Sequence, residues 1–583
     1  MLRTNICGEL NETFVGKKVS LCGWVDTRRD HGNVIFIDLR DRWGKIQLVF
    51  NPNNKEMHAL AEKVRPEYVL RVTGTVEMRP QGTTNLKLAT GMVEIHVEQL
   101  EILNTSETPP FEISDTPQVS EDLRLKYRYL DLRSQAMRER LIGRHRVVKI
   151  VRDYLDELEF VEVETPMLTK STPEGARDFL VPSRLSTGCF YALPQSPQLF
   201  KQILMVSGFD RYVQIARCFR DEDLRADRQL EHTQIDLEMS FITEEDIQTV
   251  VEGLVARVFK AVQNIELRTP FERLPYDEAM NRYGSDKPDL RFGLEIHDVT
   301  ELLKNSELKI FQAVLQAKGV IKGLKISGQN FARSDFDELT VMTQELGAKG
   351  LIWLKVLDNS FEGPVAKFIT PDQQQKLKTE FGAQPGDTIF IVADKWQTAC
   401  VVLGGLRNHF GDRFKMKDKD AFRLLWVVDF PSFEWNEEEK RCDALHHPFT
   451  SPREADLDLL EKDPLKVKAR AYDLVLNGTE IGGGSIRIHR EDIQKKVFRA
   501  LNINDEEAQE KFGFLLQALR FGAPPHGGLA LGLDRLCAIL FSVESIRDVI
   551  AFPKTQKGIC PLTNAPGQVY PKQLKELHLQ IKT

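Results

Sequence analysis

The sequence has few cysteines, and their spacing does not pair them. Eight cysteines are scattered over 583 residues, and none stands in a Cys-x-x-Cys arrangement. Structural zinc sites and disulfide frameworks need clustered or regularly spaced cysteines, so we expect no zinc and no disulfide bonds. Scattered cysteines fit the reducing cytoplasm, and we therefore expect a cytoplasmic protein.

Long apolar runs and an excess of basic residues are also missing. No apolar stretch approaches the about 20 residues that a helix needs to cross a bilayer. Residues 1–9 hold no apolar core of the kind found in signal peptides, and we expect no membrane association. The formal net charge of −7 gives nucleic-acid binding no general support. A basic footprint for nucleic acid would therefore have to be local.

The length and the local patterns of the chain predict several domains. A chain of 583 residues exceeds what one hydrophobic core accommodates. Residues 1–105 alternate apolar and polar side chains in five short segments, with a helix-like stretch at 55–65 before the fourth, as in a small OB-type β-barrel. A polar linker follows at 106–132, and residues 288–422 alternate helix and strand, as an inserted α+β domain would.

A charged hairpin is the most informative feature. Residues 217–222 and 232–238 read as two strands joined by a polar loop. Because side chains alternate between the faces of a strand, Gln234, Asp236 and Glu238 share one face, and the apolar residues between them face a core. Opposed charges gathered on one face suit a polyanionic or zwitterionic ligand. A solvated surface is the alternative, but the density of charge in the loop favours a binding site.

A second hairpin, over residues 472–489, carries two carboxylates. Asn-Gly at 477–478 predicts a two-residue turn, which places Asp473 diagonal to Glu480 on the same face. Two such carboxylates suit Mg²⁺ held together with substrate phosphates. Surface acids on an edge hairpin are the alternative. The glycines at 482–484 remove side chains where something must approach closely, and they favour the metal site.

A glycine-rich strand enters an apolar helix within residues 527–541. This segment matches neither a Walker loop nor a dinucleotide-binding glycine pattern, so by itself it is a weak indication of function. Arg535 stands at the helix start, where the helix dipole disfavours a cation, and therefore predicts an anionic ligand. Further polar clusters lie at residues 172–178, at residues 195–202 and at the pair His446–His447. A metal site at the histidine pair is the less favoured interpretation, because adjacent side chains point apart on a strand.

Together these segments resemble the class II aminoacyl-tRNA synthetases, and most closely the bacterial-type aspartyl-tRNA synthetases, from end to end. The helix and strand that stop at Pro166 look like motif one, residues 219–222 with their loop look like motif two, and residues 532–535 look like motif three. The resemblance implies a homodimer and an α+β multidomain fold. Its parts are an OB-fold anticodon-binding domain (1–105), a linker (106–132), an antiparallel-sheet catalytic domain in two pieces (133–287 and 423–556), an inserted GAD-like domain (288–422) and a C-terminal extension (557–583).

The resemblance implies that the chain activates L-aspartate with ATP and Mg²⁺ to aspartyl-adenylate and then transfers the aspartyl group to tRNA. The implied catalytic residues are Arg220, Glu222 and Arg535, and the implied Mg²⁺ ligands are Asp473 and Glu480. The implied aspartate-binding residues are Glu174, Gln198, Lys201, Arg220, Asp236, His446 and Arg487. The implied ATP-binding residues are Arg220, Asp221, Glu222, Gln229, Glu480, Gly532, Leu533, Asp534 and Arg535.

Within this set, the acidic substrate side chain should be read by positive donors. We expect Arg487, which is bidentate by geometry, to read it together with Lys201. Gln198 and Asp236 should orient these two cations. Glu174 and His446, or its neighbour His447, should meet the substrate ammonium and close the pocket.

In the barrel, the resemblance implies that anticodon bases stack on Phe36 and that Gln47 and Glu94 read base edges. His31 and Gly82 occupy loop positions where related bacterial enzymes that aspartylate both tRNA-Asp and tRNA-Asn carry the same two residues. We therefore expect this non-discriminating specificity. A discriminating ligase that uses tRNA-Asp only is the alternative.

Two other functions stay open. An asparaginyl- or lysyl-tRNA synthetase shares the barrel and the core, but the inserted domain and the pairing of Arg487 with Lys201 argue against both. A paralogue that binds tRNA or single strands without catalysis is the alternative from a different class. The presence of Arg220, Asp473 and Arg535 argues against it.

Overall fold

The computed structural model describes residues 1–115, 118–171 and 175–582, so Glu174 lies outside the described residues. The contacts divide the chain into two units. The first comprises Met1–Leu141 with Cys560–Thr563, and the second comprises Ile142–Ile559 with Asn564–Thr583. Each unit is described by itself below.

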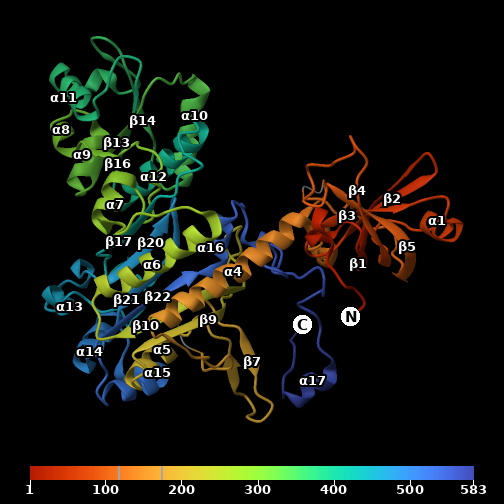
Figure 1. Cartoon of the computed structure of the whole chain (residues 1–583). Coiled ribbons are helices and arrows are strands. Elements are labelled where there is room, and N and C mark those ends of the chain that lie inside the picture. The colour runs from red at the N-terminus through yellow and green to blue at the C-terminus, as the bar shows by residue number, and fades with distance from the viewer. Residues whose placement is uncertain (116–117, 172–174, 583) are drawn as a thin grey trace. The chain divides into compact units, whose positions relative to one another are not determined.

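The first unit holds a closed five-stranded barrel, in the order β1-β2-β3-β5-β4. Apolar side chains at every second position, such as Ile35, Ile37 and Leu39, fill its interior. The strands are β1 (Lys18–His31), β2 (Val34–Arg40), β3 (Lys45–Phe50), β4 (Val69–Met78) and β5 (Val93–Asn104), and α1 (Lys55–Glu62) precedes β4. The predicted OB-type barrel is thereby confirmed (Figure 1).

The segment after the barrel is more ordered than the predicted linker. Two short helices lie in it, α2 (Glu121–Lys126) and α3 (Arg128–Asp131). The first is capped by Ser120, whose hydroxyl accepts from the backbone N–H of Leu123 at 3.4 Å. By their contacts these residues belong with the barrel unit.

The second unit is built on an eight-stranded sheet, in the order β11-β17-β20-β21-β22-β10-β9-β6. Its central neighbours pair antiparallel, and only the edge strands β11 and β6 pair parallel. The strands are β6 (Val161–Glu162), β9 (Arg211–Phe219), β10 (Glu231–Ser240), β11 (Glu272–Pro275), β17 (Leu424–Val428), β20 (Ala471–Leu476), β21 (Thr479–Ile486) and β22 (His526–Gly532). The predicted antiparallel-sheet α+β core is confirmed.

The two faces of this sheet differ in chemistry because the residues alternate. One face carries apolar side chains such as Ile235, Leu237 and Leu529, and helices pack on it (Figure 1). These helices are α4 (Gln135–Glu157), α6 (Glu244–Gln263) and α16 (Leu533–Leu540). The other face carries charged side chains beside glycine and alanine. Small residues leave room above the sheet, so this face is the one that can hold a ligand.

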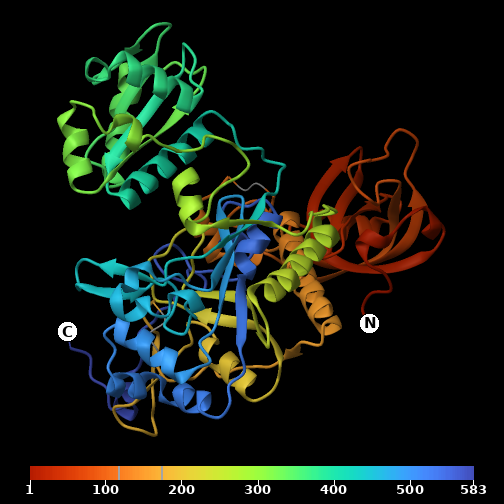
Figure 2. The same ribbon diagram turned by 90° about the vertical axis from the view of Figure 1, so that its left-hand side faces the viewer.

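A smaller sheet, in the order β12-β13-β16-β14-β15, lies within residues 288–422. Helices surround it, as Figure 2 shows, and two apolar clusters fill the space between sheet and helices. Its strands are β12 (His297–Asp298), β13 (Val320–Ile326), β14 (Ile352–Val356), β15 (Phe361–Glu362) and β16 (Thr388–Asp394). Its helices are α8 (Thr300–Leu303), α9 (Lys309–Gln316), α10 (Arg333–Glu345), α11 (Pro371–Phe381) and α12 (Trp396–Arg413). The alternation predicted for this region is thus observed.

The remaining elements border the large sheet or follow it. They are β7 (Leu180–Pro182), β8 (Phe190–Ala192), α5 (Gln198–Val206), α7 (Tyr276–Tyr283), β18 (Phe433–Asn436), β19 (Arg441–Ala444), α13 (Leu459–Lys462), α14 (Glu491–Ala500), α15 (Asp505–Leu519) and α17 (Pro571–Glu576). Every helix in the described ranges is too short or too polar to cross a bilayer.

Candidate active site

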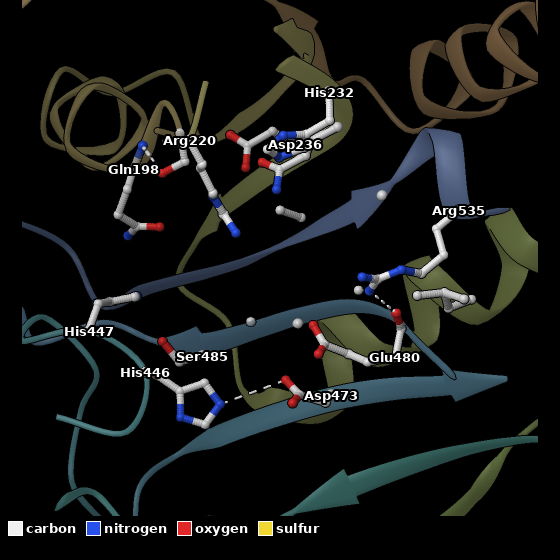
Figure 3. Close-up of a pocket in the computed structure, with 18 of the residues that line it drawn as sticks. Gln198, Arg220, His232, Asp236, His446, His447, Asp473, Glu480, Ser485 and Arg535 are labelled. Atoms are coloured by element: carbon white, nitrogen blue, oxygen red, sulfur yellow. Dashed lines mark hydrogen bonds and ion pairs between the residues drawn. The ribbon is translucent and has the colours of Figure 1, made fainter. Parts of the chain in front are cut away.

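A cavity of about 530 Å³ opens on the polar face of the large sheet. A single row of paired residues crosses its floor: Asp236 of β10, Ala530 of β22, Gly483 of β21 and Asp473 of β20. Acids stand at the two ends of the row, with small residues between them (Figure 3). Three strand spacings separate the ends, which amounts to roughly 14 Å. The floor therefore suits an elongated ligand with a polar group at each end.

One end of the cavity holds a buried cluster of four charged side chains, here called the charged quartet: Lys201, Asp236, Glu238 and Arg487. The Lys201 ammonium lies 2.8 Å from Asp236 Oδ1 and 3.3 Å from Glu238 Oε2. Arg487 Nε and Nη2 donate to the two oxygens of Glu238 at 2.9 and 3.0 Å. The exposed fractions are 2% for both cations, 1% for Asp236 and 0% for Glu238. Buried charges persist only when they are paired, and here the two signs balance.

The pKa values in this cluster follow from burial and pairing. Burial raises the pKa of Asp236, although Lys201 opposes the shift. Burial also opposes ionisation of Glu238, but Arg487 and Lys201 outweigh it and hold its pKa below the usual value. Burial, followed by the charge of Arg487, lowers the pKa of His447, so this ring is neutral. Its Nε2 lies 2.8 Å from Arg487 Nη1 and accepts a hydrogen bond from it.

These contacts correct the predicted roles of the quartet. The bidentate fork of Arg487 is occupied by Glu238, so it is not presented to a ligand as we expected. Asp236 orients Lys201, whereas Glu238, Ser485 and His447 orient Arg487. Glu238 has to lie under Arg487 because a guanidinium this deeply buried needs a carboxylate.

Three buried polar atoms at the cavity have no hydrogen-bond partner among the described residues. They are Asp236 Oδ2, Gln198 Nε2 and His446 Nδ1. Native proteins rarely leave such atoms unpaired, so each of them needs a ligand or a water. The carboxylate oxygen accepts, the amide nitrogen donates and the ring nitrogen can do either, so these atoms can bind both a cationic and an anionic group of a small molecule.

The other end of the floor carries Asp473 and Glu480. The turn pairs Val475 with Glu480, as predicted, and Asp473 lies opposite Gly483. A Cβ on Gly483 would stand 2.5 Å from Asp473 Oδ1 and 3.7 Å from Glu480 Oε1, so only glycine leaves the carboxylates room. Asp473, and secondly burial, raises the pKa of Glu480.

The chemistry of this carboxylate pair suits Mg²⁺. Two acids whose repulsion hinders ionisation are stabilised by a divalent cation, and oxygen donors are the ligands that Mg²⁺ prefers. The nearest ring is that of His446, whose Nε2 lies 3.7 Å from Asp473 Oδ1. His446 thus lies near the carboxylate pair and lines the cavity, and its contact with the substrate ammonium stays a prediction. Among the described residues no group of three or more His, Cys, Asp or Glu could hold a metal by itself. The pair therefore fits Mg²⁺ with phosphate oxygens completing its coordination.

The motif-two residues overhang the cavity from the loop after β9. Arg220 points into it (Figure 3), and its guanidinium has no hydrogen-bond or ion-pair partner among the described side chains. Glu222 is held by Arg228 at 3.1 Å. Gln229 is buried, and its Oε1 accepts from the backbone N–H of Lys554 at 2.9 Å. Arg220 is therefore the most available cation for an anionic ligand.

The motif-three segment contributes one cation. Arg535 Nη1 donates to the carbonyl of Glu480 at 2.5 Å, and its Nη2 lies 3.4 Å from Asp227. Gly532 and Asp534 line the cavity, but the carboxylate of Asp534 already accepts from Arg144 and from the backbone of Thr233.

Two expected nucleotide contacts are not at the cavity. The side chain of Leu533 is buried in the core, so only its backbone could meet a ligand. Asp221 is not among the lining residues and lies 3.8 Å from Arg177. A sequence motif covers consecutive residues. Because successive side chains point in different directions, some residues within the motif point away from the ligand.

Several residues at the site were not predicted as site residues, among them Ser485 and His232, which line the cavity, and Glu238, which holds Arg487. Glu238 could have been found, since it shares a strand face with Asp236. His232 is mostly buried, and burial followed by Arg220 lowers its pKa to about 3. Its neutral ring forms part of the cavity wall beside Arg220. Ser485 carries no sequence pattern that marks it, whereas His447 belongs to the histidine pair noted in the sequence and lines the cavity beside Arg487.

Two of the barrel residues predicted to read bases, Phe36 and Gln47, lie on the outer face of the barrel, and the third, Glu94, is 4% exposed. Phe36 pairs with Arg29, and Gln47 pairs with Asp38, on the face opposite the core. Gln47 Nε2 donates to Glu94 Oε2 at 2.8 Å. An aromatic ring beside fixed polar groups is the arrangement that single-stranded bases use for stacking and edge recognition.

His31 and Gly82 are both exposed in loops of the barrel unit. His31 is the last residue of β1, at a two-residue turn formed by Gly32 and Asn33, whose φ values are 58° and 67°. Gly82 has a φ of 84° and no neighbour within 4 Å of a built Cβ. Both residues are exposed, so a role in binding is compatible with both positions.

Comparison with known families gives two matches along the chain. Residues 120–556 match the model of the class II tRNA synthetases (D, K and N). Residues 19–103 match the model of the OB-fold nucleic acid binding domain.

Close relatives match over the full length. The Aspartate--tRNA(Asp/Asn) ligase of Aquifex aeolicus is 55% identical, over 99% of this chain and 98% of its own. The ligase of the same name from Thermodesulfovibrio yellowstonii is 56% identical over 100% of both chains. Among solved structures, the asparaginyl-tRNA synthetase of Pyrococcus horikoshii complexed with asparaginyl-adenylate has a TM-score of 0.59 and 21% identity, over 98% of this chain and 100% of its own. That similarity speaks for the fold alone.

Proposed function

The chain belongs to the class II tRNA synthetases of the D, K and N group, and on that premise we propose that it is an aspartate–tRNA ligase. It activates L-aspartate with ATP and transfers the aspartyl group to tRNA. The observation that carries the choice of amino acid is the charged quartet, whose two cations, Lys201 and Arg487, are buried at one end of the cavity. The names of the relatives that are 55 and 56% identical, Aspartate--tRNA(Asp/Asn) ligase, agree with this choice of amino acid.

We propose that L-aspartate binds with its side-chain carboxylate toward the two cations of the quartet. Arg487 meets it with the one N–H of Nη2 that Glu238, His447 and Ser485 leave, and Lys201 meets it with a remaining N–H. The free oxygen of Asp236 then accepts from the substrate ammonium. Gln198 Nε2 donates to the substrate from α5. Asparagine lacks the carboxylate that the two cations would meet, and lysine would bring a third cation to them.

We propose that ATP lies along the rest of the floor, with its α-phosphate under Arg220. An oxygen of the substrate α-carboxylate attacks the α-phosphorus, the bond to the bridging oxygen breaks, and pyrophosphate leaves with the electron pair. Arg220 and Arg535 stabilise the charge that develops on the phosphate oxygens. Asp473 and Glu480 would hold Mg²⁺, which supplies positive charge to the same oxygens. Glu222 and Gln229 lie on the nucleotide side.

In the second step, a terminal ribose hydroxyl of tRNA attacks the aspartyl carbonyl, and AMP leaves. We propose that the barrel binds the anticodon through Phe36, Gln47 and Glu94, and that the chain acts as a homodimer. We also propose a cytoplasmic location, since scattered cysteines without a disulfide pattern fit a reducing compartment.

The deciding experiment is amino-acid-dependent ATP–pyrophosphate exchange with aspartate, asparagine and lysine. We expect exchange with aspartate only. Exchange confined to asparagine or lysine would replace the proposed substrate, and no exchange with any of the three would favour a tRNA-binding protein without catalysis.

We also propose that both tRNA-Asp and tRNA-Asn are charged, since the relatives' printed names include both. His31→Leu should then lower kcat/KM for tRNA-Asn by about tenfold or more, the discrimination expected of one mismatched base. Charging of tRNA-Asp should change by less than about twofold, because His31 is exposed and supports no other group. Aminoacylation of the two purified tRNAs measures this. An equal loss on both tRNAs contradicts the role of His31. If the unsubstituted protein does not charge tRNA-Asn at all, the chain is the discriminating ligase that uses tRNA-Asp only.

A further inference from the structure

The tip of the hairpin that carries Asp473 and Glu480 is held by the two segments that lead into and out of the inserted domain. The tip consists of Asn477 and Gly478, with φ values of 52° and 80°. Asp473 lies on β20 and Glu480 on β21, a few residues from the tip on either side. The position of the tip therefore sets where the two carboxylates lie.

The segment that leads from the large sheet into the inserted domain, residues 284–296, is here called the outgoing segment. It contacts the tip through Asp289. The Asp289 Cβ would lie 3.0 Å from a Cβ on Gly478, so the two backbones approach as closely as glycine allows. The carboxylate of Asp289 accepts from the backbone and the guanidinium of Arg291, at 3.1 Å and 2.7 Å, which fixes the bend of the segment. Asp286 of the same segment lines the cavity. One segment thus joins the cavity wall, the hairpin tip and the inserted domain.

The returning segment, residues 414–423, grips the tip from the other side. The backbone N–H of Arg423 donates to Asn477 Oδ1 at 2.8 Å, and the backbone N–H of Asn477 donates to the carbonyl of Arg423 at 3.1 Å. The Asn477 side-chain N–H donates to the carbonyl of Ala421 at 2.9 Å. Asparagine therefore does more here than permit a left-handed turn, because both ends of its amide are used.

Arg407 of α12 fastens the outgoing segment to the inserted domain. Its guanidinium is 1% exposed and donates to the carbonyls of Asp289, Phe292 and Leu294 at 2.8, 2.9 and 3.2 Å. It also stacks 4.0 Å from the centre of the Phe292 ring. Within the described ranges no carboxylate forms an ion pair with it. All of its hydrogen bonds therefore go to the backbone of residues 289–294 and fix the conformation of that segment.

The geometry points to a positioning role for the inserted domain in the use of Mg²⁺ and ATP. Arg407 fixes the outgoing segment, the contacts of Asp289 and Asn477 carry that position to the hairpin tip, and Asp473 and Glu480 are held at the spacing that the metal and the phosphates need. Arg407 is a positioning residue, since it touches neither substrate. The inference rests on the proposed function, because its test measures the binding of ATP and Mg²⁺.

The test uses two variants of the full chain from distant positions, Arg407→Lys and Asn477→Asp. The first keeps the charge but loses the three-carbonyl grip, and the second keeps the acceptor but loses the bond to Ala421. Each should raise the Kd for ATP in the presence of Mg²⁺ by about tenfold, within the about 100-fold that a misplacement of ~1 Å can cost. The Kd in EDTA and the KM for aspartate should stay within about twofold, because the quartet lies at the far end of the floor from the tip. Calorimetric titration with ATP, with Mg²⁺ and with EDTA, gives the first two values.

Two matched controls separate positioning from loss of stability. Leu377→Ala removes a buried side chain from the inserted domain away from both connecting segments. Asn502→Asp makes the same chemical change at another left-handed position, with φ of 57°. Neither should alter the Mg²⁺-dependent part of ATP binding. The inference is overturned if Leu377→Ala has the same effect as Arg407→Lys, if ATP binding weakens equally in EDTA, or if both test variants bind normally. The absence of aspartate-dependent exchange in the unsubstituted protein would instead contradict the proposed function.

Discussion

Replacing Arg487 with methionine is expected to lower kcat/KM for aspartate in ATP–pyrophosphate exchange by about 1000-fold or more. Sites built around a buried charged donor lose this much when the donor is removed. The same change should also destabilise the catalytic unit by about 3 kcal/mol, because Glu238 stays behind as a buried carboxylate. Lys201, 3.3 Å from Glu238, limits that loss. Exchange kinetics and the midpoint of thermal unfolding measure the two effects.

A second substitution separates recognition from stability. Glu238→Gln, added to Arg487→Met, removes the orphaned charge and should restore most of the thermal midpoint. It should not restore aspartate use, since the positive donor is still missing. The Kd for ATP should stay within about twofold in both variants, as the nucleotide lies toward Arg220 and Arg535. If the double variant regains aspartate-dependent exchange, Arg487 serves only to hold Glu238 and does not read the substrate.

The fold could be predicted where local patterns determine it. Strict alternation in the barrel strands and in β10 fixes which side chains face inward, whatever the rest of the chain does. The turn at Asn477 and Gly478 likewise sets the pairing of Val475 with Glu480, although an irregularity between Leu474 and Val475 then shifts the register and places Asp473 opposite Gly483. Each of these features depends on interactions over a short stretch of sequence.

The site was harder to predict where pairing spans the whole chain. Arg487 meets Glu238 across 249 positions, and no local pattern reveals which acid a buried guanidinium chooses. Because of that pairing and the bonds to His447 and Ser485, the side chain expected to bind the substrate with two N–H groups has a single N–H left for it. The grip of residues 421–423 on the hairpin tip is equally invisible in the sequence, since it depends on where an inserted domain returns to the sheet.

Arg220→Met is expected to lower kcat for exchange by about 100- to 1000-fold, the loss that follows removal of one preorganised donor from a developing anion. Unlike Arg487, Arg220 has no hydrogen-bond or ion-pair partner among the described side chains, so the thermal midpoint should be unchanged. The pKa of His232, held at about 3 by burial and secondly by the charge of Arg220, should rise when that charge is removed. NMR titration of the ring follows this shift without any substrate.

Arg217→Met is the matched control for Arg220→Met, because Arg217 lies near the end of β9, three residues before Arg220, but pairs with Glu231 and does not line the cavity. Exchange in that variant should stay within about threefold of the unsubstituted protein, as for most exposed substitutions. A large loss in both variants would mean that β9 itself is disturbed. A normal kcat for Arg220→Met would move the α-phosphate to another cation, and Arg535 is the one within the same cavity. The contrast with Arg487 follows from what each arginine contacts: a side chain bonded within the protein affects both stability and activity, whereas one without such bonds affects activity alone.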